Sequence, residues 1–366
     1  MKTKLLFSIR DFRQGGVPRC LQSLLQHLDT ERYEVQLFVM HQDGPYRGNM
    51  PNCTVLPEDK MVRSLLTYRG NASLWDKVLK GGRTIGRKLF KWDLLEWRFR
   101  KIARKIDCDV AVAYSEGFPA RFIQYVSAPK KIVWVHNDYR FDAQAGEGTP
   151  FEKFDRIICF SHSALKSFVE IYPDLNDRAV AIHNFVNFEQ IRALALEEEN
   201  EIDRTKTVVV SIGRIDYPKR FDIIPRIAAR LKGRLAFNWY IIGDGPQSLK
   251  EEVVRAIEEF GVSNEVHLLG SKDNPYKYLK GADVMAVTSR FECYPTVVNE
   301  ALCLGVPVVM NDIPVASEML TPANGIITDY DHFADAILAA RSLTVEFVDE
   351  NEEIGKRLEG ELTVVR

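Results

Sequence analysis

Short apolar runs rich in β-branched residues recur along this chain, and their alternation with helical segments constrains its fold more than any other feature. The first set comprises Thr3–Ile9, Tyr33–Met40, Cys108–Ser115, Lys130–Asn137, Asp155–Ser161 and Arg178–Asn184. Apolar runs of this length that alternate with helices are typical of parallel strands covered on both faces of a sheet. The pattern therefore predicts an α/β fold built on doubly wound parallel sheets.

The pattern restarts after a polar, acid-rich stretch that follows Asn187. The second set comprises Thr207–Arg214, Phe237–Gly245, Glu265–Gly270, Ala282–Ser289, Val306–Asp312 and Asn324–Asp329. Because 366 residues exceed the length at which a single core stops growing, we expect two domains, residues 1–190 and 205–345, and a tail over residues 346–366. Ligands of such sheets bind beyond the carboxyl ends of the strands, so we expect a site in a cleft between the domains.

The composition is that of an ordinary globular protein, with 46% hydrophobic and 27% charged residues. Six cysteines are scattered without a C-x-x-C pair, which argues against a zinc site or a disulfide framework and favours reduced thiols. The first apolar run is too short for a signal peptide, and no stretch reaches the roughly 18 apolar residues of a membrane span. We therefore expect a cytoplasmic protein.

The charge is unevenly distributed, since residues 1–190 contain 29 Lys and Arg against 22 Asp and Glu. Much of the excess falls in Lys80–Lys105, where ten basic residues interleave with apolar ones at helical spacing. Such a segment is typical of a helix on an anionic membrane surface, and the alternative is a packed helix with a solvated basic face. Nucleic acid is a poor candidate partner because the pI is about 6.4 and no other basic stripe is present.

Two glycines, Gly15 and Gly16, follow the first expected strand and precede an expected helix. Glycines there let the backbone approach a ligand, and a helix N-terminus favours an anion; a plain tight turn is the alternative. The dinucleotide fingerprint is incomplete here and at "GDGP" (Gly243–Pro246), where Ser248 replaces the third glycine. A nicotinamide-dependent enzyme is therefore disfavoured.

Two cations, Arg214 and Lys219, lie just beyond a strand end in "GRIDYPKR". They can neutralise a pyrophosphate, Arg through bidentate hydrogen bonds and Lys as a point charge, unless they are ordinary surface charges. In the first half His136 ends a strand and would face the expected cleft, with a purely structural role as the alternative. The D-x-D pattern Asp107–Asp109 precedes its strand, so we interpret it as a turn and expect no metal.

The stretch "SRFECYPTVVNEALCLGVPVV", from Ser289 to Val309, carries two acids around a short apolar helix. The sequence predicts that this helix begins at Pro295 and stops at Gly305. Glu292 then lies in the loop before the helix, and Glu300 lies in its second turn.

The first turn of this helix would offer unpaired N–H donors from Thr296, Val297 and Val298. These donors can hold a phosphate while Glu292 and Glu300 address groups on either side of it, Glu300 accepting from a vicinal diol such as a ribose. The spacing suits a nucleotide sugar. The alternative is a solvated Glu292 and a structurally paired Glu300.

These motifs resemble, in order and spacing, those of retaining glycosyltransferases of the GT-B fold, in the large fourth sequence family that builds cell-surface polysaccharides and glycolipids. The similarity is most specific over Val208–Asn324, with "SIGR…PKR", "IIGDGP", "LLG" and "ADVMAVTSRFECYP…NEALCLGVPVV", and it is looser over "GGVPRCLQSLL", "WVHND", "ICFSHSALKS" and "IHNFVN". The resemblance implies two Rossmann-like domains that face each other across a cleft. The N-terminal one would hold the acceptor and the C-terminal one the nucleotide sugar.

The resemblance also implies roles for individual residues. The pyrophosphate would be contacted by Arg214 and Lys219, the ribose by Glu300, and the transferred sugar by Glu292 and His136. Further contacts with the donor would come from Tyr294, Thr296 and Val297, with Gly15 and Gly16 at the reaction centre. Such enzymes keep the anomeric configuration, with the departing phosphate assisting the attacking hydroxyl on the same face. They also need no metal or other cofactor. The sequence departs from the family at Cys293, where glycine or serine is common, and this bears on the shape of the sugar pocket.

We therefore expect a hexosyltransferase that moves a sugar from a nucleotide diphosphate donor, UDP-linked, to a lipid-linked or glycan acceptor. Two alternatives stay open. A sugar-nucleotide epimerase can share the two-domain architecture, and a catalytically silent partner of another transferase would retain the fold without the reaction.

Overall fold

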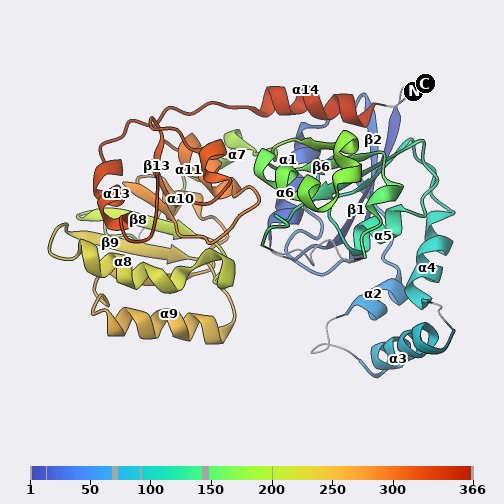
Figure 1. Cartoon of the computed structure of the whole chain (residues 1–366), viewed down its shortest axis with the longest axis horizontal. Coiled ribbons are helices and arrows are strands. Elements are labelled where there is room, and N and C mark those ends of the chain that lie inside the picture. Colours follow the sequence, from blue (N-terminus) through green and yellow to red (C-terminus); the bar gives the residue numbers. More distant parts are fainter. Residues whose placement is uncertain are drawn as a thin grey trace. The chain divides into compact units, whose positions relative to one another are not determined.

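The computed structural model describes residues 2–13, 15–67, 73–90, 93–141, 148–199 and 201–363, with the backbone alone for residues 85–90. The chain forms two compact units (Figure 1). Unit 1 comprises residues 1–185 together with 351–366, and unit 2 comprises residues 186–350. Each unit has its own parallel sheet, which confirms the predicted α/β class.

The sheet of unit 1 has seven parallel strands in the order β3-β2-β1-β4-β5-β6-β7. Their bounds are Thr3–Asp11 (β1), Tyr33–His41 (β2), Thr54–Val55 (β3), Val110–Ala113 (β4), Lys130–Val135 (β5), Arg156–Cys159 (β6) and Ala179–Ala181 (β7). All six predicted strands of this half are present. Only β3 was not predicted, because two residues are too few to show a periodic pattern.

The helices of unit 1 include one that comes from the end of the chain. Their bounds are Gly16–His27 (α1), Lys60–Leu66 (α2), Leu74–Phe90 (α3), Leu94–Ala103 (α4), Phe118–Ile123 (α5), His162–Ile171 (α6) and Asn351–Leu362 (α14), with 3-10 turns at Phe151–Lys153 (η2) and Pro173–Arg178 (η3). Helix α14 buries Ile354, Leu358 and Leu362. Its Glu361 carboxylate pairs with Arg156 at 2.7 Å, so the end of the chain packs as part of unit 1.

The sheet of unit 2 has six parallel strands in the order β10-β9-β8-β11-β12-β13. Their bounds are Thr207–Ile212 (β8), Phe237–Ile242 (β9), Val266–Gly270 (β10), Val284–Val287 (β11), Val308–Asn311 (β12) and Gly325–Thr328 (β13). The helices are Phe188–Leu194 (α7), Ile224–Leu231 (α8), Gln247–Glu259 (α9), Tyr276–Leu279 (α10), Thr296–Cys303 (α11), Ala316–Met319 (α12) and Phe333–Ala340 (α13), with 3-10 turns at Tyr217–Lys219 (η4) and Phe221–Ile223 (η5). All six strands of the second predicted set are confirmed.

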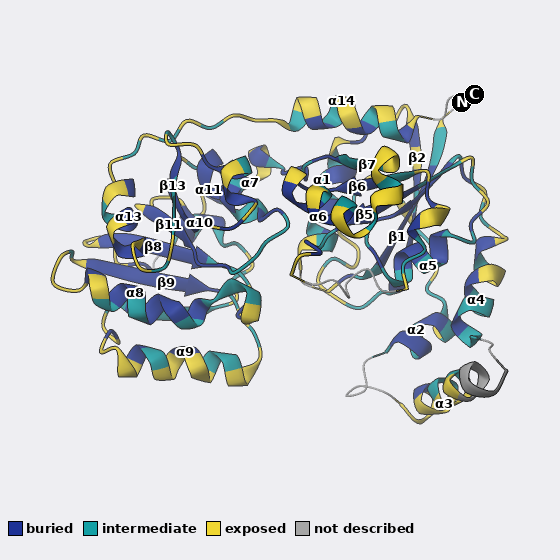
Figure 2. Ribbon diagram, in the orientation of Figure 1, coloured by how far each residue is buried: buried dark blue, intermediate teal, exposed yellow. Residues whose placement is uncertain are grey.

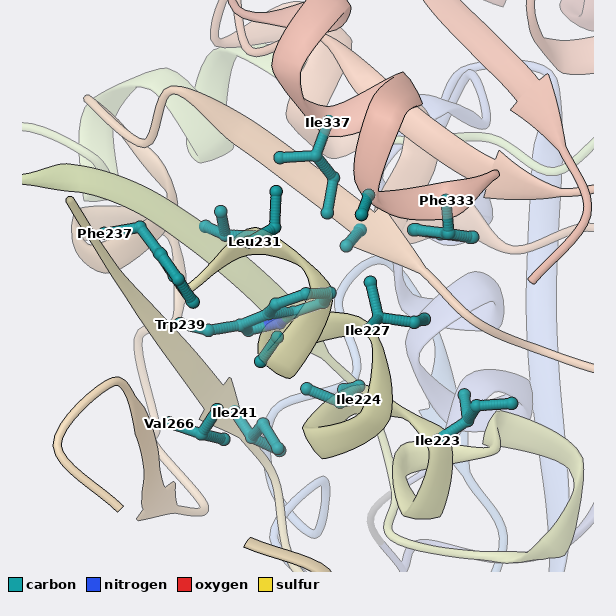
Figure 3. Packing of buried hydrophobic residues seen from close by; sticks show 14 of the residues in the cluster. Ile223, Ile224, Ile227, Leu231, Phe237, Trp239, Ile241, Val266, Phe333 and Ile337 are labelled. Carbon is teal, nitrogen blue, oxygen red and sulfur yellow. The ribbon is translucent and has the colours of Figure 1, made fainter. Parts of the chain in front are cut away.

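Trp239 on β9 is fully buried in the hydrophobic core of unit 2 (Figure 3). The side chains that form this core include Ile224, Ile227, Leu231, Phe237, Phe333 and Ile337. The indole N–H donates to Ser211 Oγ at 3.1 Å, and that hydroxyl donates to the Ala286 carbonyl at 2.7 Å. The buried indole nitrogen is thus satisfied within the sheet. Figure 2 shows central strands of both units, such as β4 and β9, in the buried class along their whole length.

The polar stretch after Asn187 folds as helix α7 and belongs to unit 2. Asn187 caps the helix by accepting the Gln190 N–H at 2.9 Å. Phe188 and Ile191 on the helix pack with Tyr276 in a small buried cluster. The structure therefore changes unit at residue 185, before the acid-rich stretch begins.

Both sheets reverse their strand order beside a central strand. In unit 1 the order reverses between β1 and β4, and in unit 2 it reverses between β8 and β11. At such a point the loops that follow the two strands run in opposite directions, which leaves room for a ligand at the carboxyl ends. The segments that follow β1, β5, β8 and β11 carry the predicted site residues.

Candidate functional site

The loop that follows β8 carries both predicted cations. Arg214 is exposed, and Lys219 ends the 3-10 turn η4. Asp216 caps this turn, since its carboxylate accepts the Lys219 N–H at 3.4 Å and its carbonyl accepts the same N–H at 3.2 Å. Burial raises the pKa of Asp216, while the nearby charges of Lys219 and Arg214 act in the opposite direction. The cap therefore positions the backbone of Lys219, from which its side chain extends.

The glycines of "GDGP" have a structural explanation. A Cβ atom on Gly243 would lie 1.8 Å from the Gly213 carbonyl oxygen, and one on Gly245 would lie 2.0 Å from the Ile215 carbonyl oxygen. The Ile215 N–H donates to the Asp244 carbonyl at 2.9 Å. The loop after β9 thus supports the loop after β8 backbone to backbone, and only glycine permits that approach.

Lys219 and Glu292 form the centre of the candidate site in unit 2. The Lys219 Nζ atom lies 2.5 Å from Oε1 of Glu292, and both side chains are mostly buried. The Ser289 hydroxyl donates to the same carboxylate oxygen at 2.6 Å. The loops after β8 and β11, which flank the reversal of strand order, are therefore joined by one charge-assisted cluster.

Sequence reasoning did not find the residues that hold the end of β11. The Thr288 hydroxyl donates to the Lys219 carbonyl at 2.9 Å. The Asn311 amide donates to the Ser289 carbonyl at 3.0 Å, and the Tyr330 hydroxyl donates to the Thr288 carbonyl at 3.0 Å. All of these residues lie at or just beyond strand ends, so a search of polar residues at those positions could have found them.

Helix α11 begins one residue later than predicted and ends where predicted. Pro295 has an extended ψ of 97° and serves as the N-cap, so the first helical residue is Thr296. At the other end, the Gly305 N–H donates to the Leu302 carbonyl and the Val306 N–H to the Ala301 carbonyl, both at 3.0 Å. These bonds form a Schellman motif, in which Gly305 has the left-handed φ of 77° that glycine accepts readily.

One of the three predicted phosphate donors is engaged within the chain. The Val298 N–H donates to the Pro295 carbonyl at 3.0 Å, because the first turn is tightened around the proline. The expectation that Val298 offers an unpaired donor is therefore wrong. Thr296 and Val297 stand at the N-terminus of the helix, as predicted.

Glu300 lies in the second turn of α11, as predicted, but it is only 1% exposed. The Cys303 thiol donates to its main-chain carbonyl at 3.2 Å. Tyr294, in the loop before the helix, is also buried, and its hydroxyl accepts from the Asn299 amide at 3.1 Å. Burial raises the pKa of Tyr294 well above its usual range. Cys293, between Glu292 and Tyr294, is partly exposed.

In unit 1, Gly15 and Gly16 stand at the start of α1. Gly15 is the N-cap in an extended conformation, and a Cβ atom on either glycine would meet no atom within 4 Å. The fold therefore does not require glycine at these two positions, in contrast to Gly243 and Gly245.

His136 directly follows β5 and is held by a main-chain group. Its Nε2 atom lies 2.8 Å from the Tyr114 carbonyl oxygen, and its ring packs edge to face on Phe160 with centroids 4.4 Å apart. Because a carbonyl only accepts, Nε2 carries the proton and Nδ1 is the acceptor. Burial lowers the pKa of His136 to about 3, so the ring is neutral near pH 7.

Glu116, after β4, is another residue that was not predicted from the sequence. Its Oε1 atom accepts the main-chain N–H of His136 at 2.9 Å, the main-chain N–H of Asn137 at 3.2 Å and the Asn137 side-chain amide at 3.2 Å. The residue is buried, and burial raises the pKa of its carboxyl group to about 7. Glu116 therefore anchors the loop that carries His136.

Several charges in the other charged motifs of unit 1 are paired within it. In "DCD", Asp107 pairs with the Lys4 ammonium at 2.6 Å and Asp109 accepts the Lys4 N–H at 2.9 Å, at the amino end of β4. In Lys80–Lys105, Arg83 pairs with Asp93 at 2.8 Å and Arg98 with Asp59 at 2.6 Å. Residues 91 and 92 of that segment, and the side chains of residues 85–90, lie outside the described residues.

The described part of the chain contains neither a group of metal ligands nor a helix that could span a membrane. Within the ranges given above, no three His, Cys, Asp or Glu side chains are grouped as metal ligands would be. None of the helices in those ranges combines the length and the hydrophobicity needed to cross a bilayer.

Residues 194–355, which contain Arg214, Lys219, Glu292 and Glu300, match the family described as "Glycosyl transferases group 1". This stretch of the chain resembles the group 1 glycosyl transferases. The resemblance drawn from the motifs is therefore confirmed.

The chain is similar to two bacterial proteins named as glycosyltransferases. One is the N-acetylgalactosamine-N,N'-diacetylbacillosaminyl-diphospho-undecaprenol 4-alpha-N-acetylgalactosaminyltransferase of Campylobacter jejuni, 24% identical over 324 residues that cover 84% of this chain and 80% of the relative. Another is the amylovoran biosynthesis glycosyltransferase AmsD of Erwinia amylovora, 24% identical over 325 residues that cover 86% of this chain and 82% of the relative.

Two solved structures resemble the chain over nearly its whole length. HepE of Anabaena, in complex with UDP and glucose, has a TM-score of 0.70 at 16% sequence identity. The match covers 98% of this chain and 100% of the HepE chain. TarM of S. aureus, in a complex that includes UDP, has a TM-score of 0.71 at 14% sequence identity. The match covers 99% of this chain and 100% of the TarM chain. These likenesses confirm the GT-B fold that the sequence predicts.

Proposed function

We propose that this chain is a retaining, metal-independent glycosyltransferase that moves a sugar from a UDP-sugar to a lipid-linked or glycan acceptor in polysaccharide or glycolipid biosynthesis. The observation that carries the proposal is the cluster of Lys219, Glu292 and Ser289 where the strand order of unit 2 reverses. The N-terminus of α11 follows the cluster within a few residues. A cation, a carboxylate and a helix N-terminus at one sheet edge suit the diphosphate and sugar of a nucleotide sugar.

The donor and acceptor classes are supported by the relatives. HepE and TarM contain UDP in their complexes, and the Campylobacter jejuni relative is named for an undecaprenol-diphospho-linked acceptor. The name of AmsD points to polysaccharide synthesis. A lipid-linked acceptor also agrees with a cytoplasmic enzyme that binds the inner face of the cell membrane through Lys80–Lys105.

The transfer breaks the bond between the anomeric carbon and the β-phosphate oxygen of the donor, and UDP leaves with that electron pair. The acceptor oxygen forms its bond to the anomeric carbon on the same face, and its proton passes to an oxygen of the departing β-phosphate. Arg214 and Lys219 would stabilise the developing diphosphate charge together with the N–H groups of Thr296 and Val297. No metal is needed in this scheme, because these groups supply the positive potential.

In the proposed complex Glu292 holds hydroxyls of the transferred sugar, and Glu300 accepts from the ribose diol. His136 offers Nδ1 as an acceptor, since Nε2 is committed to the Tyr114 carbonyl. Gly15 and Gly16 carry no side chain, which would let the donor approach the start of α1 closely. The fold itself has room for a Cβ atom at both positions.

The experiment that tests the proposal is a screen of UDP-, GDP- and ADP-sugars for thermal stabilisation, followed by product analysis in the presence of EDTA. A ligand that binds only the folded chain raises its melting temperature, and we expect this for a UDP-sugar. With an acceptor, we expect a glycoside that keeps the donor's anomeric configuration. An isomerised donor without any glycoside would instead support the epimerase, and no reaction with any donor would support a silent partner.

A further inference from the structure

Helix α3 presents apolar side chains to the outside of unit 1. Leu74, Trp75 and Val78 are 81%, 64% and 56% exposed, and at 100° per residue these three positions share one face of the helix. Gly81 and Gly82 continue the same face and are also exposed. Figure 2 shows the exposed class along the described part of α3. We call Leu74, Trp75 and Val78 the outer face of α3.

The opposite face of α3 is polar and is held against the protein. Asp76 is buried, and it forms a capping box with Ser73, whose N–H it meets at 2.8 Å. One turn on, the Lys80 ammonium donates to the Thr67 carbonyl. Arg83 pairs with Asp93 at 2.8 and 3.0 Å. Over residues 74–84, where the structure describes the side chains, the amphipathic order is thus inverted, because a surface helix normally turns its apolar side inward.

An inverted helix of this kind needs an apolar environment on its outer side. The sequence of this region is strongly basic, since Lys80–Lys105 contains ten basic residues and two acidic ones. Lys77 on α3 is exposed, as are Arg100, Lys101, Arg104 and Lys105 at the end of α4. Trp97 on α4 also lies 4.3 Å beneath the Lys101 ammonium. Apolar side chains, cations and indoles together match the boundary between the acyl chains and the anionic headgroups of a bilayer.

We propose that the outer face of α3 inserts into the acyl boundary of an anionic membrane, while the exposed cations of α3 and α4 bind lipid headgroups. Leu74, Trp75 and Val78 anchor the enzyme, and the paired cations Arg83 and Arg98 serve the fold instead. This inference rests on the proposed function only in the expectation of a lipid-linked acceptor. It assigns the membrane contact to residues before the basic segment, as well as to part of that segment.

The test uses the full chain in flotation with vesicles of phosphatidylcholine alone or with 30 mol% phosphatidylglycerol. We expect flotation with the anionic vesicles, and we expect the triple variant Leu74→Gln, Trp75→Gln, Val78→Gln to lower partitioning by about tenfold or more, since burial of one such side chain can supply that factor. The matched control changes Leu196→Gln and Val348→Gln, two residues of unit 2 that are 73% and 76% exposed. This control should float like the original chain.

Tryptophan fluorescence provides a second measurement. Anionic vesicles should shift the emission of the original chain to shorter wavelength, and Trp75→Phe should remove that part of the shift while flotation stays within about threefold. Melting temperatures of all variants establish that they are folded.

Three results would overturn the inference. The first is no flotation of the original chain, and the second is unchanged flotation of the triple variant. The third is a dimer in light scattering that the triple variant converts to a monomer. That result would show that the outer face of α3 is a contact between two copies of the chain. The proposed function is tested separately, because the triple variant should keep the transfer rate on a water-soluble acceptor.

Discussion

The Lys219 ammonium lies 2.5 Å from Oε1 of Glu292, and this pair joins the loops after β8 and β11 at the point where the strand order of unit 2 reverses. The Ser289 hydroxyl donates to the same oxygen. A ligand diphosphate at this position would compete with Glu292 for the ammonium, which would release the carboxylate toward the sugar. Both side chains are therefore expected to matter more for turnover than for folding.

Lys219→Met should lower kcat by roughly 10²- to 10³-fold, because loss of one preorganised donor to a developing negative charge has an effect of that order. The Kd for UDP should change less than kcat. Steady-state kinetics and calorimetry with UDP measure the two effects. Arg226→Met, which removes a surface pair with Asp331, is the matched control and should keep full activity; an equally active Lys219→Met would contradict the pyrophosphate role.

Glu300→Gln should weaken UDP-sugar binding by roughly 10- to 150-fold, since a charge-assisted hydrogen bond contributes about 1.5–3 kcal/mol. Gln is the better substitution than Ala because Glu300 is 1% exposed, and truncation would also leave a cavity. Titration calorimetry with UDP and with uridine diphosphate lacking both ribose hydroxyls measures the effect. The variant should bind the two compounds alike, and if it still discriminates between them the ribose assignment fails.

Glu116→Gln should change the dependence of stability on pH. The carboxyl pKa is raised from 4.5 to about 7 by burial, so the folded chain holds this proton more tightly than the unfolded chain between those values. The stabilisation is complete below about pH 4.5 and is lost as the pH rises to about 7. Relative to the Glu116→Gln variant, the original chain should lose about 2–3 kcal/mol of unfolding free energy across this window.

Urea unfolding from pH 4.5 to 8 measures this difference. Tyr139 and Cys159 face Glu116, and their raised pKa values keep both protonated in the window. His136 has the same lowered pKa in both chains, so its contribution cancels on subtraction. The exposed Glu152, changed to Gln, should show no such slope, and a flat difference for Glu116→Gln would disprove the buried titration.

Gly245→Ala should destabilise unit 2 by about 1–3 kcal/mol or more, because its Cβ atom would lie 2.0 Å from the Ile215 carbonyl oxygen. The shift should displace the loop that carries Lys219 and lower activity as well. Gly360→Ala in helix α14 meets nothing within 4 Å and should instead stabilise by up to about 1 kcal/mol. Thermal unfolding of the two variants provides the comparison, and similar melting temperatures would show that the loops do not require this contact.

Gly16→Ala should leave stability nearly unchanged and lower the transfer rate. The fold has room for a Cβ atom at this position, so a loss of activity reports on a ligand. A folded variant with full kcat/KM would show that the start of α1 is only a turn.

The sequence by itself determined the strands other than β3, the class of sheet and the C-terminal end of α11. Buried parallel strands read as continuous apolar runs because both of their faces are covered, and Gly305 stops the helix because its left-handed φ is a local property. The motif order around Arg214, Lys219, Glu292 and Glu300 was sufficient to indicate the family that residues 194–355 match. These features depend on residues that are near neighbours in the chain.

Only the tertiary structure decided which distant residues meet. Lys219 and Glu292 are 73 positions apart, and Glu116 is 20 positions from His136, so no periodicity links them. The contact of Gly245 with Ile215 likewise could not be found from the sequence. For the outer face of α3, the helical pattern shows which side chains share a face, but it does not show which face the rest of the protein covers. Contacts between strand ends and the burial of a helix face are set by how the sheet and its helices pack, and that packing involves the whole unit.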